Sequence, residues 1–237
     1  MSVRVGVISF PGSNCEHDVL EGLSSLGADA EIIWHADRSL KGADAVIIPG
    51  GFAHGDYLRC GAIARFSPIM ESVTQFAMAG GPVLGICNGF QVLTEAGLLP
   101  GALMRNSGLR FLCENATLEV VNDSSILTSM NQVGDQIRLP INHGEGNYTC
   151  DAETLARIED QGQVVLRYMD NPNGSLARIA GVSNEMGNVV GLMPHPERAF
   201  DLLFGSADGR SLFASVLGAA EHFSVSKRDS ADSVGRS

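Results

Sequence analysis

The chain has no Cys-x-x-Cys pair, and its five cysteines stand far apart in the sequence. An odd number of isolated cysteines argues against a disulfide framework, and the absence of paired spacing argues against a zinc site. No two histidines have the spacing of metal ligands on one helix, so we predict no protein-bound metal. The cysteines are therefore expected to be reduced thiols.

Basic side chains are scarce, because 16 lysines and arginines face 27 acidic residues and the formal net charge is -11. No basic cluster interrupts this excess, so the long-range field would repel a phosphate backbone, and we expect no nucleic acid partner. No stretch reaches the roughly 20 apolar residues of a membrane span, and the N-terminus lacks the layout of a signal peptide. We therefore expect no membrane partner and a cytoplasmic location.

Short apolar runs that end at glycine or proline alternate with helical patterns in the first part of the chain. The runs are apolar on both faces, which is typical of buried strands in a parallel sheet. Between about 102 and 169, strand-like segments are joined by turn residues, and we expect them to form antiparallel additions or a side sheet. The sequence thus predicts an α/β fold with a doubly wound, mostly parallel sheet and antiparallel additions.

No linker-like stretch divides the chain and no internal repeat is found. We therefore predict one domain over residues 1–223. The polar segment 224–237 has no apolar periodicity, and we predict that it is a mobile C-terminal tail.

The first candidate for chemistry is Cys87, in the run Gly85-Ile86-Cys87-Asn88-Gly89 between an apolar strand and a helix. Small residues two positions before and after a nucleophile let strand and helix approach closely in a strained turn, and the helix dipole favours the thiolate. The alternative is a small buried residue at a strand end. Cys15 also follows a strand end, but the helix after it begins with acidic residues, which disfavour a thiolate.

A second strand end carries His195 and Glu197, with Pro196 between them. Residues two apart in an extended segment point the same way, so the carboxylate can bind one imidazole nitrogen and leave the other free to exchange a proton with a thiol. At a third strand end, Gly50 and Gly51 can turn backbone N–H groups into a crevice, and Asn88 can supply a second N–H. Together the three strand ends predict a site for acyl transfer.

In these contexts the runs "LGICNGFQ", "PGGF" and "MPHPE" resemble the nucleophile, oxyanion and His-Glu motifs of the class I glutamine amidotransferases. This resemblance implies a flavodoxin-like fold and a glutaminase that hydrolyses L-glutamine to glutamate and ammonia with a catalytic triad of Cys87, His195 and Glu197. It implies substrate-binding roles for a further set of residues: Gly50, Gly51, Phe52, Asn88, Gln91, Arg105, His143 and Gly144.

Further runs narrow the resemblance to the small, separately encoded glutaminases of purine biosynthesis: "FPGSNCEHD", "GGFAHGDYLRCGAIARFSP", "RNSGLRF" and "PINHGEGNY". In these relatives ammonia passes to a large synthetase subunit, which uses ATP and magnesium, and a small third subunit completes the complex. The resemblance implies no cofactor on this chain itself. Asn142 departs from the small residue expected before "HGEG", which would affect the glutamine pocket only mildly.

Three alternatives remain at this stage. Another class I glutaminase, such as one that serves pyridoxal phosphate synthesis, would share the triad, although the run "GDYLRCGAIA" argues against it. A non-catalytic scaffold with this fold would be expected to have lost a triad residue. A cysteine peptidase would share the Cys-His-acid chemistry but act on a different substrate.

Overall fold

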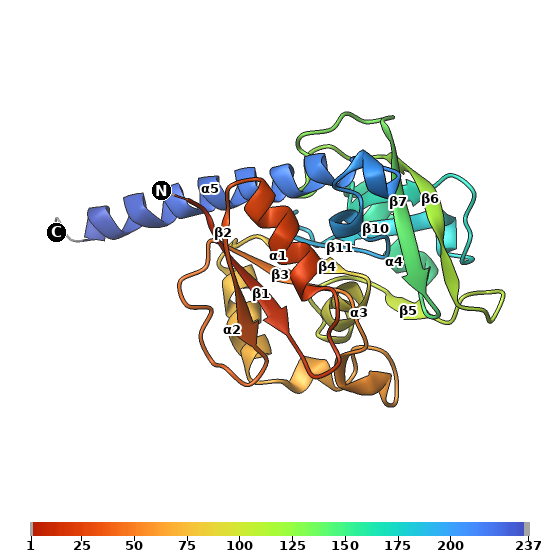
Figure 1. The fold of residues 1–237 in the computed structure, drawn as a ribbon, viewed down its shortest axis with the longest axis horizontal. Coiled ribbons are helices and arrows are strands. Elements are labelled where there is room, and N and C mark those ends of the chain that lie inside the picture. Colours follow the sequence, from red (N-terminus) through yellow and green to blue (C-terminus); the bar gives the residue numbers. More distant parts are fainter. Residues whose placement is uncertain (1, 235–237) are drawn as a thin grey trace.

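Nine strands form one continuous sheet in the computed structural model, which describes residues 2–234 (Figure 1). The five strands on one side of the sheet pair in parallel, and the four on the other side pair antiparallel. In spatial order the strands are β2 (Asp29–Trp34), β1 (Arg4–Ser9), β3 (Ala45–Ile48), β4 (Val83–Ile86), β11 (Val189–Leu192), β10 (Ile179–Ser183), β9 (Val164–Tyr168), β6 (Leu112–Val120) and β7 (Gln136–His143).

Helices cover both faces of the parallel part, which confirms the doubly wound prediction. α1 (Glu16–Ser25) and α5 (Gly209–Val234) lie together over one face, while α2 (Ile69–Met78) and α3 (Asn88–Glu95) lie over the other (Figure 1). The connections β1-α1-β2 and β3-α2-β4 run in opposite directions across the sheet, so right-handed crossovers place their helices on opposite faces.

The middle of the chain adds the antiparallel strands to the main sheet and also forms a small separate sheet of two strands, β5 (Ala102–Met104) and β8 (Asn147–Thr149). α4 (Ala152–Asp160) lies between β8 and β9, and its N-cap Asp151 accepts a hydrogen bond from the Thr154 N–H. The predicted choice between antiparallel additions and a side sheet is thus resolved, because the chain contains both.

The apolar runs of the sequence become the centre of the core. Every residue of β3, β4, β10 and β11 is buried, because helices or neighbouring segments cover both faces of these strands. β7, at the sheet edge, instead alternates buried with more exposed positions, as expected of an antiparallel strand with one covered face. Each fully buried Val, Leu or Ile contributes about 1.5–3 kcal/mol of apolar burial.

α5 does not stop at the predicted domain boundary at Phe223 but continues to Val234, so the predicted tail begins inside this helix. The helix extends past the body of the molecule (Figure 1). Residues 235–237 lie outside the described residues, and mobility of the tail stays a prediction.

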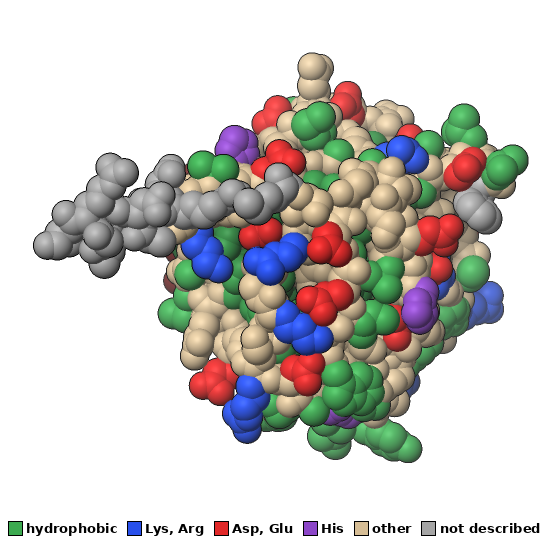
Figure 2. Space-filling model, turned by 60° about the vertical axis from the view of Figure 1, so that its left-hand side comes forward, with side chains coloured by type: hydrophobic (Ala, Val, Ile, Leu, Met, Phe, Trp, Pro, Cys, Tyr) green, Lys and Arg blue, Asp and Glu red, His purple; other side chains and the backbone are tan. Residues whose placement is uncertain are grey.

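Within residues 2–234 no helix combines the length and the apolar character that crossing a membrane requires. On the face seen in Figure 2, acidic and basic side chains are interspersed, and no broad patch of one sign gathers there. The short 3-10 helices that matter for the site are η1 (Ala53–Asp56), η2 (Ala64–Phe66) and η4 (Pro196–Arg198).

Candidate active site

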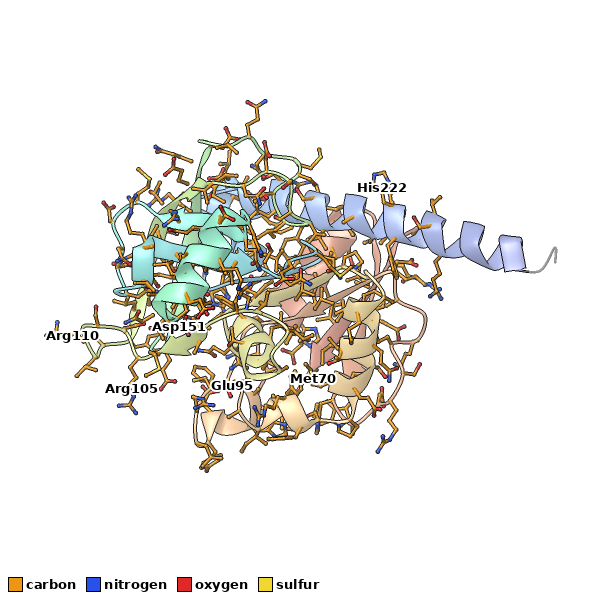
Figure 3. All side chains as sticks on the ribbon, turned by 180° about the vertical axis from the view of Figure 1, so that it is seen from behind. Met70, Glu95, Arg105, Arg110, Asp151 and His222 are labelled. Carbon is orange, nitrogen blue, oxygen red and sulfur yellow. The ribbon has the colours of Figure 1, made fainter. Side chains whose placement is uncertain are left out.

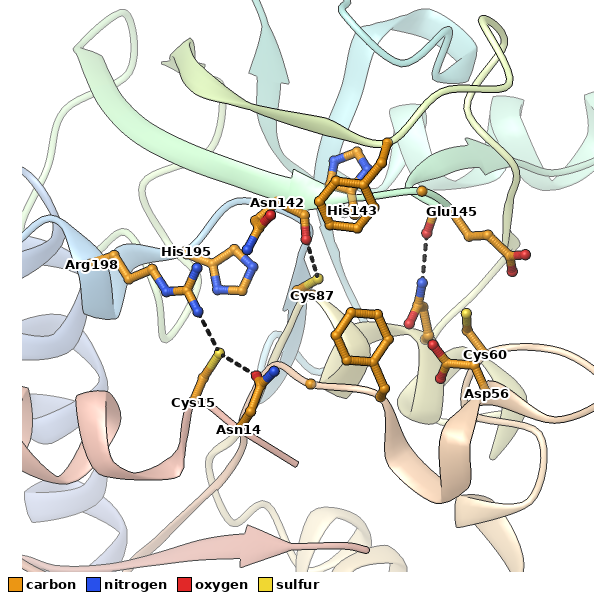
Figure 4. A pocket seen from close by; sticks show the side chains of 15 residues that line it. Asn14, Cys15, Asp56, Cys60, Cys87, Asn142, His143, Glu145, His195 and Arg198 are labelled. Carbon is orange, nitrogen blue, oxygen red and sulfur yellow. Dashed lines mark hydrogen bonds between the residues drawn. The ribbon is translucent and has the colours of Figure 1, made fainter. Parts of the chain in front are cut away.

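A pocket of about 180 Å³ opens where the carboxyl ends of β1, β3, β4 and β11 meet β7 (Figure 4). Parallel strands bring these ends to one edge of the sheet, which is where ligands bind in open α/β folds. The pocket is lined by Asn14, Cys15, Gly51, Phe52, Asp56, Cys60, Cys87, Gln91, Phe111, Asn142, His143, Gly144, Glu145, His195 and Arg198.

Cys87 occupies a strained turn between β4 and α3. Its φ of 49° and ψ of -103° lie in a region that non-glycine residues seldom adopt, at a typical cost of about 1–3 kcal/mol. The turn is held by a hydrogen bond of 2.8 Å from the Cys87 N–H to the Leu192 carbonyl. The side chain lines the pocket, with Sγ 3.9 Å from the Asn142 carbonyl oxygen, although the residue is only 6% exposed.

Two glycines make this turn possible. A Cβ added to Gly89 would lie 1.9 Å from the Ile48 carbonyl oxygen, and one added to Gly85 would lie 2.7 Å from the Gly89 backbone. Strand β3, strand β4 and helix α3 therefore approach each other more closely than any side chain at these positions would permit. This is the close packing that the Gly-x-Cys-x-Gly spacing predicts.

His195 and Glu197 are brought together as their spacing predicts. His195 Nδ1 lies 2.6 Å from Glu197 Oε1, and the His195 N–H donates to the Pro140 carbonyl over 2.8 Å. Gly50 permits this placement, because a Cβ there would lie 2.7 Å from His195 Cε1. Gly50 thus supports the imidazole from behind and is not among the residues that line the pocket.

The second nitrogen of His195 is unengaged. Nε2 is buried and has no hydrogen-bond partner among the described residues. Burial by itself lowers the pKa of His195, but the charges of Glu197 and of Cys87 outweigh it and hold that pKa well above its ordinary value. The ring is therefore suited to carry a proton beside a thiolate.

The two backbone N–H groups that the sequence predicts as oxyanion donors, those of Gly51 and Asn88, have no backbone partner within residues 2–234. Ser13 and Gly51 form an isolated antiparallel bridge closed by bonds from Phe52 N–H to Gly12 O and from Asn14 N–H to Gly50 O, so the Gly51 N–H points away from Ser13. The Asn88 N–H is at the first residue of α3, where it has no partner within the helix. Both can donate to an oxyanion beside Cys87.

Other predicted substrate-binding residues have different surroundings. The Phe52 N–H donates a hydrogen bond to the Gly12 carbonyl, so it is not a free donor. Phe52 instead contributes a half-exposed side chain to the pocket wall. Gln91 lines the pocket, yet its amide is engaged at both ends: Oε1 accepts from Asn88 Nδ2 over 2.9 Å and Nε2 donates to the Glu145 carbonyl over 2.6 Å.

His143 and Gly144 line the pocket at the end of β7, whereas Arg105 does not. The Arg105 side chain is 78% exposed and projects from the edge of the molecule (Figure 3), with Nε 3.5 Å from a Glu145 carboxylate oxygen. A direct contact of Arg105 with a substrate stays a prediction.

Asn106, which sequence reasoning missed, holds His143 in place. Its Nδ2 donates to the His143 and Arg110 carbonyls, so its Oδ1 is the atom that accepts from the Gly146 N–H and lies 3.1 Å from His143 Nδ1. Burial, followed by the charge of His195, lowers the pKa of His143 to about 4, so that its imidazole is neutral. Asn106 lies within the run "RNSGLRF", and this motif was the feature of the sequence that could have pointed to it.

Cys15, the rival thiol, also reaches this pocket. It is 1% exposed, its Sγ donates to Asn14 Oδ1 over 3.1 Å, and Arg198 Nη2 donates to it over 3.1 Å. Cys15 Sγ and atoms of His195 and Glu197 lie within 4.8 Å of one another, the arrangement of a possible metal site within the described residues. The Arg198 guanidinium on the same sulfur disfavours a cation there, and the absence of a metal stays a prediction.

Comparison with known proteins agrees with this fold. A family model described as a CobB/CobQ-like glutamine amidotransferase domain matches residues 2–211. The chain therefore belongs to this family of glutamine amidotransferases.

Individual relatives are more specific. The chain is 53% identical to phosphoribosylformylglycinamidine synthase subunit PurQ of Chlorobaculum parvum, covering 96% of this chain and 93% of that protein. It is 56% identical to the subunit of the same name from Rubrobacter xylanophilus, over 92% of this chain and 100% of that protein. A solved structure described as PurLQS from Thermotoga maritima superposes with a TM-score of 0.85 at 43% identity, covering 92% of this chain and 99% of that one.

Proposed function

We propose that this chain is the glutaminase subunit of a phosphoribosylformylglycinamidine synthase, acting in de novo purine biosynthesis. The observation that carries the chemistry is a thiol on a strained strand-to-helix turn beside a buried imidazole that a carboxylate orients. The names of its relatives support the particular reaction, and they favour it over a glutaminase of pyridoxal phosphate synthesis.

The geometry supports a two-stage hydrolysis of L-glutamine. The Cys87 thiolate attacks the side-chain carboxamide carbon, and the carbonyl electron pair moves to oxygen, where the N–H groups of Gly51 and Asn88 stabilise it. His195, protonated by transfer from the thiol, donates that proton to the departing nitrogen, and ammonia leaves a thioester on Cys87.

Water then completes the reaction. Neutral His195 takes a proton from a water molecule that attacks the thioester carbon, the C–S bond breaks, and the proton returns to sulfur as glutamate leaves. Glu197 holds the tautomer of His195 throughout and stabilises its charged form through the 2.6 Å contact at Nδ1. The negative charge of Glu197 does not itself change in this cycle.

The ammonia is used on a partner. We propose that a large synthetase subunit, which cleaves ATP and uses magnesium as a cofactor, takes up the ammonia to convert formylglycinamide ribonucleotide to its amidine, with a small third subunit in the complex. The solved relative is itself described as PurLQS. No cofactor is assigned to this chain, and we place the reaction in the cytoplasm.

The test is synthesis by purified subunits with glutamine or with ammonium as nitrogen donor. Cys87→Ala should abolish glutamine-dependent synthesis and leave ammonium-dependent synthesis intact, because only the first needs the thiol. Cys113→Ala, which removes an exposed thiol on β6, is the matched control and should leave both intact. Equal loss of both activities in Cys87→Ala, or retained glutamine use, would overturn the proposal.

The competing functions give different results. Rescue of growth without purines in a strain that lacks this glutaminase supports the proposal, whereas rescue of vitamin B6 auxotrophy would support the other glutaminase. A diazo-ketone analogue of glutamine should label Cys87 in the assembled complex. An unlabelled Cys87 there would indicate a non-catalytic scaffold, and peptide cleavage that Cys87→Ala abolishes would indicate a peptidase.

A further inference from the structure

Three polar side chains gather at the end of the pocket away from His195. Asp56 lies at the end of η1, Cys60 follows it in the loop before η2, and Glu145 follows β7. Figure 4 shows them together on one side of Cys87, with His195 and Arg198 on the other. The mechanism uses none of the three.

The two carboxylates at this end lack a cation inside the pocket. The Cys60 thiol lines the pocket beside both carboxylates, and its pKa is raised by burial and by both of them. The arginine among the described residues that line the pocket is Arg198, which lies at the other end on Cys15. Arg105 approaches Glu145 only from the solvent side.

The electrostatics agree with this geometry. Burial raises the pKa of Asp56 and the charge of Glu145 raises it further, against hydrogen bonds from Cys60 and Asn88 that lower it. Burial and the same two carboxylates raise the pKa of the Cys60 thiol, so it stays a neutral donor. Half-buried carboxylates that repel each other are stabilised by a cation placed between them.

Beside this pocket there is also a buried acceptor without a partner in the part of the chain that the structure describes, His143 Nε2, whose ring packs against Gly146. Asn106 Oδ1 is an acceptor, so His143 Nδ1 carries the ring proton and Nε2 has a free lone pair. This Nε2 belongs to a residue that is 3% exposed and lines the pocket, and it has no partner among the described residues.

We propose that Asp56 and Glu145, which lie on either side of Cys60 in the pocket lining, bind the α-ammonium group of the substrate and so select a free amino acid. The inference rests on the proposed glutaminase function, because it places the second end of glutamine once Cys87 holds the first. Gln91 positions this end, since its amide joins Asn88, which also donates to Asp56, to the Glu145 backbone. This assignment replaces a direct role for Arg105.

The experiment compares two substrates in the complex assembled with the synthetase subunit. One is L-glutamine and the other is glutaramate, which is glutamine without its α-amino group, and ammonia release is measured for both. The variants are Asp56→Asn and Glu145→Gln. Glu221→Gln, on an exposed position of α5, is the matched control.

The wild-type complex and the control should prefer glutamine. Each pocket variant should lower kcat/KM for glutamine, mainly through KM, and leave that for glutaramate nearly unchanged, so the preference falls by about tenfold or more. Retained turnover of glutaramate shows that the variant is folded and that its triad works.

Other outcomes overturn the assignment. An equal loss with both substrates would mean that the pair only supports the fold. An unchanged preference combined with weaker activation by the synthetase subunit would mean that the pair binds a basic side chain of the partner. If the wild-type complex hydrolysed neither substrate, the proposed function itself would fail, and this inference with it.

Discussion

The two ends of the pocket are built in different ways. At the end with Cys87, His195 and Glu197, every functional residue is at most 6% exposed and lies within a few residues of a core strand. At the end with Asp56, Cys60 and Glu145, two of the three residues lie on the loop after β3, whose Tyr57 and Leu58 are 73% and 95% exposed.

Backbone conformation shows the same contrast. The catalytic end contains one strained non-glycine residue, Cys87, held by tight packing on both sides. The loop around Asp56 contains three left-handed non-glycine residues, at His54, Asp56 and Leu58. The comparison indicates that bond-making groups are placed by rigid strand ends, whereas the proposed recognition of the α-ammonium group depends in part on an exposed loop.

The largest expected effect comes from Glu197→Gln. The substitution keeps the shape of the side chain but removes the charge that orients His195 and stabilises its protonated form, so glutamine-dependent activity should fall by about 100-fold to 10,000-fold. Ammonium-dependent synthesis should be unaffected. Steady-state rates of the assembled complex check this, and a loss of less than fivefold would mean that His195 does not need its carboxylate.

Gly89→Ala tests whether packing holds the catalytic end. The added methyl would meet the Ile48 carbonyl, so we expect a loss of about 3 kcal/mol in the free energy of unfolding, together with loss of activity. Gly218→Ala, at a helical position with open space around it, should instead stabilise by about 0.5–1 kcal/mol. Denaturant unfolding measures both, and equal stabilities would contradict the strained-turn account.

His143, on the wall between the two ends, predicts a dependence of stability on pH. Its pKa is lowered to about 4 in the folded chain, while the unfolded chain titrates near 6.5, so the unfolded state binds more protons as the pH falls. This residue should therefore cost about 2 kcal/mol of stability between pH 7 and pH 5.

The measurement compares unfolding at the two pH values for the wild type and for His143→Gln, which cannot titrate in this range. The substitution should flatten the dependence by that amount. An identical slope in the two proteins would show that His143 is charged, or exposed, in the folded chain.

The smallest effect concerns the reactivity of the Cys60 thiol at the recognition end, which is the end of the pocket with Asp56, Cys60 and Glu145. The raised pKa of Cys60 predicts slow alkylation at pH 8, whereas the exposed Cys113 should react readily. Peptide mass spectrometry after brief treatment with iodoacetamide gives both rates. Glu145→Gln should speed the alkylation of Cys60, because it removes a charge that raises the pKa of the thiol. An unchanged rate would show that Glu145 does not influence Cys60.

Much of the catalytic end could be predicted, because its signals are local. The spacing of Gly85 and Gly89 around Cys87 indicates that the backbones of β3, β4 and α3 approach each other closely. A side chain at either glycine would block this approach. The spacing of His195 and Glu197 places both side chains together across a single proline. Such patterns act within five residues and do not depend on the rest of the fold.

The recognition end could not be predicted from the sequence in the same way. Asp56 and Glu145 are far apart in the sequence, each is an ordinary surface residue type, and only the loop after β3 and the end of β7 bring them to one pocket. Arg105 illustrates the converse, because the family resemblance implied a substrate contact while the structure leaves its side chain 78% exposed and outside the pocket lining.

By itself, the sequence determined the alternation of strands and helices, the strained turn at Cys87 and the pairing of His195 with Glu197, since each follows from side-chain period, glycine and short-range spacing. Only the tertiary structure decided which atoms are free to meet a substrate. Packing engages the amide of Gln91 and the N–H of Phe52 and leaves His143 Nε2 without a partner among the described residues. It also brings the carboxylates of Asp56 and Glu145 to one pocket, where Glu145 pairs with the exposed Arg105. Hydrogen bonding and charge balance in a buried site depend on all of its neighbours at once, and no local pattern records them.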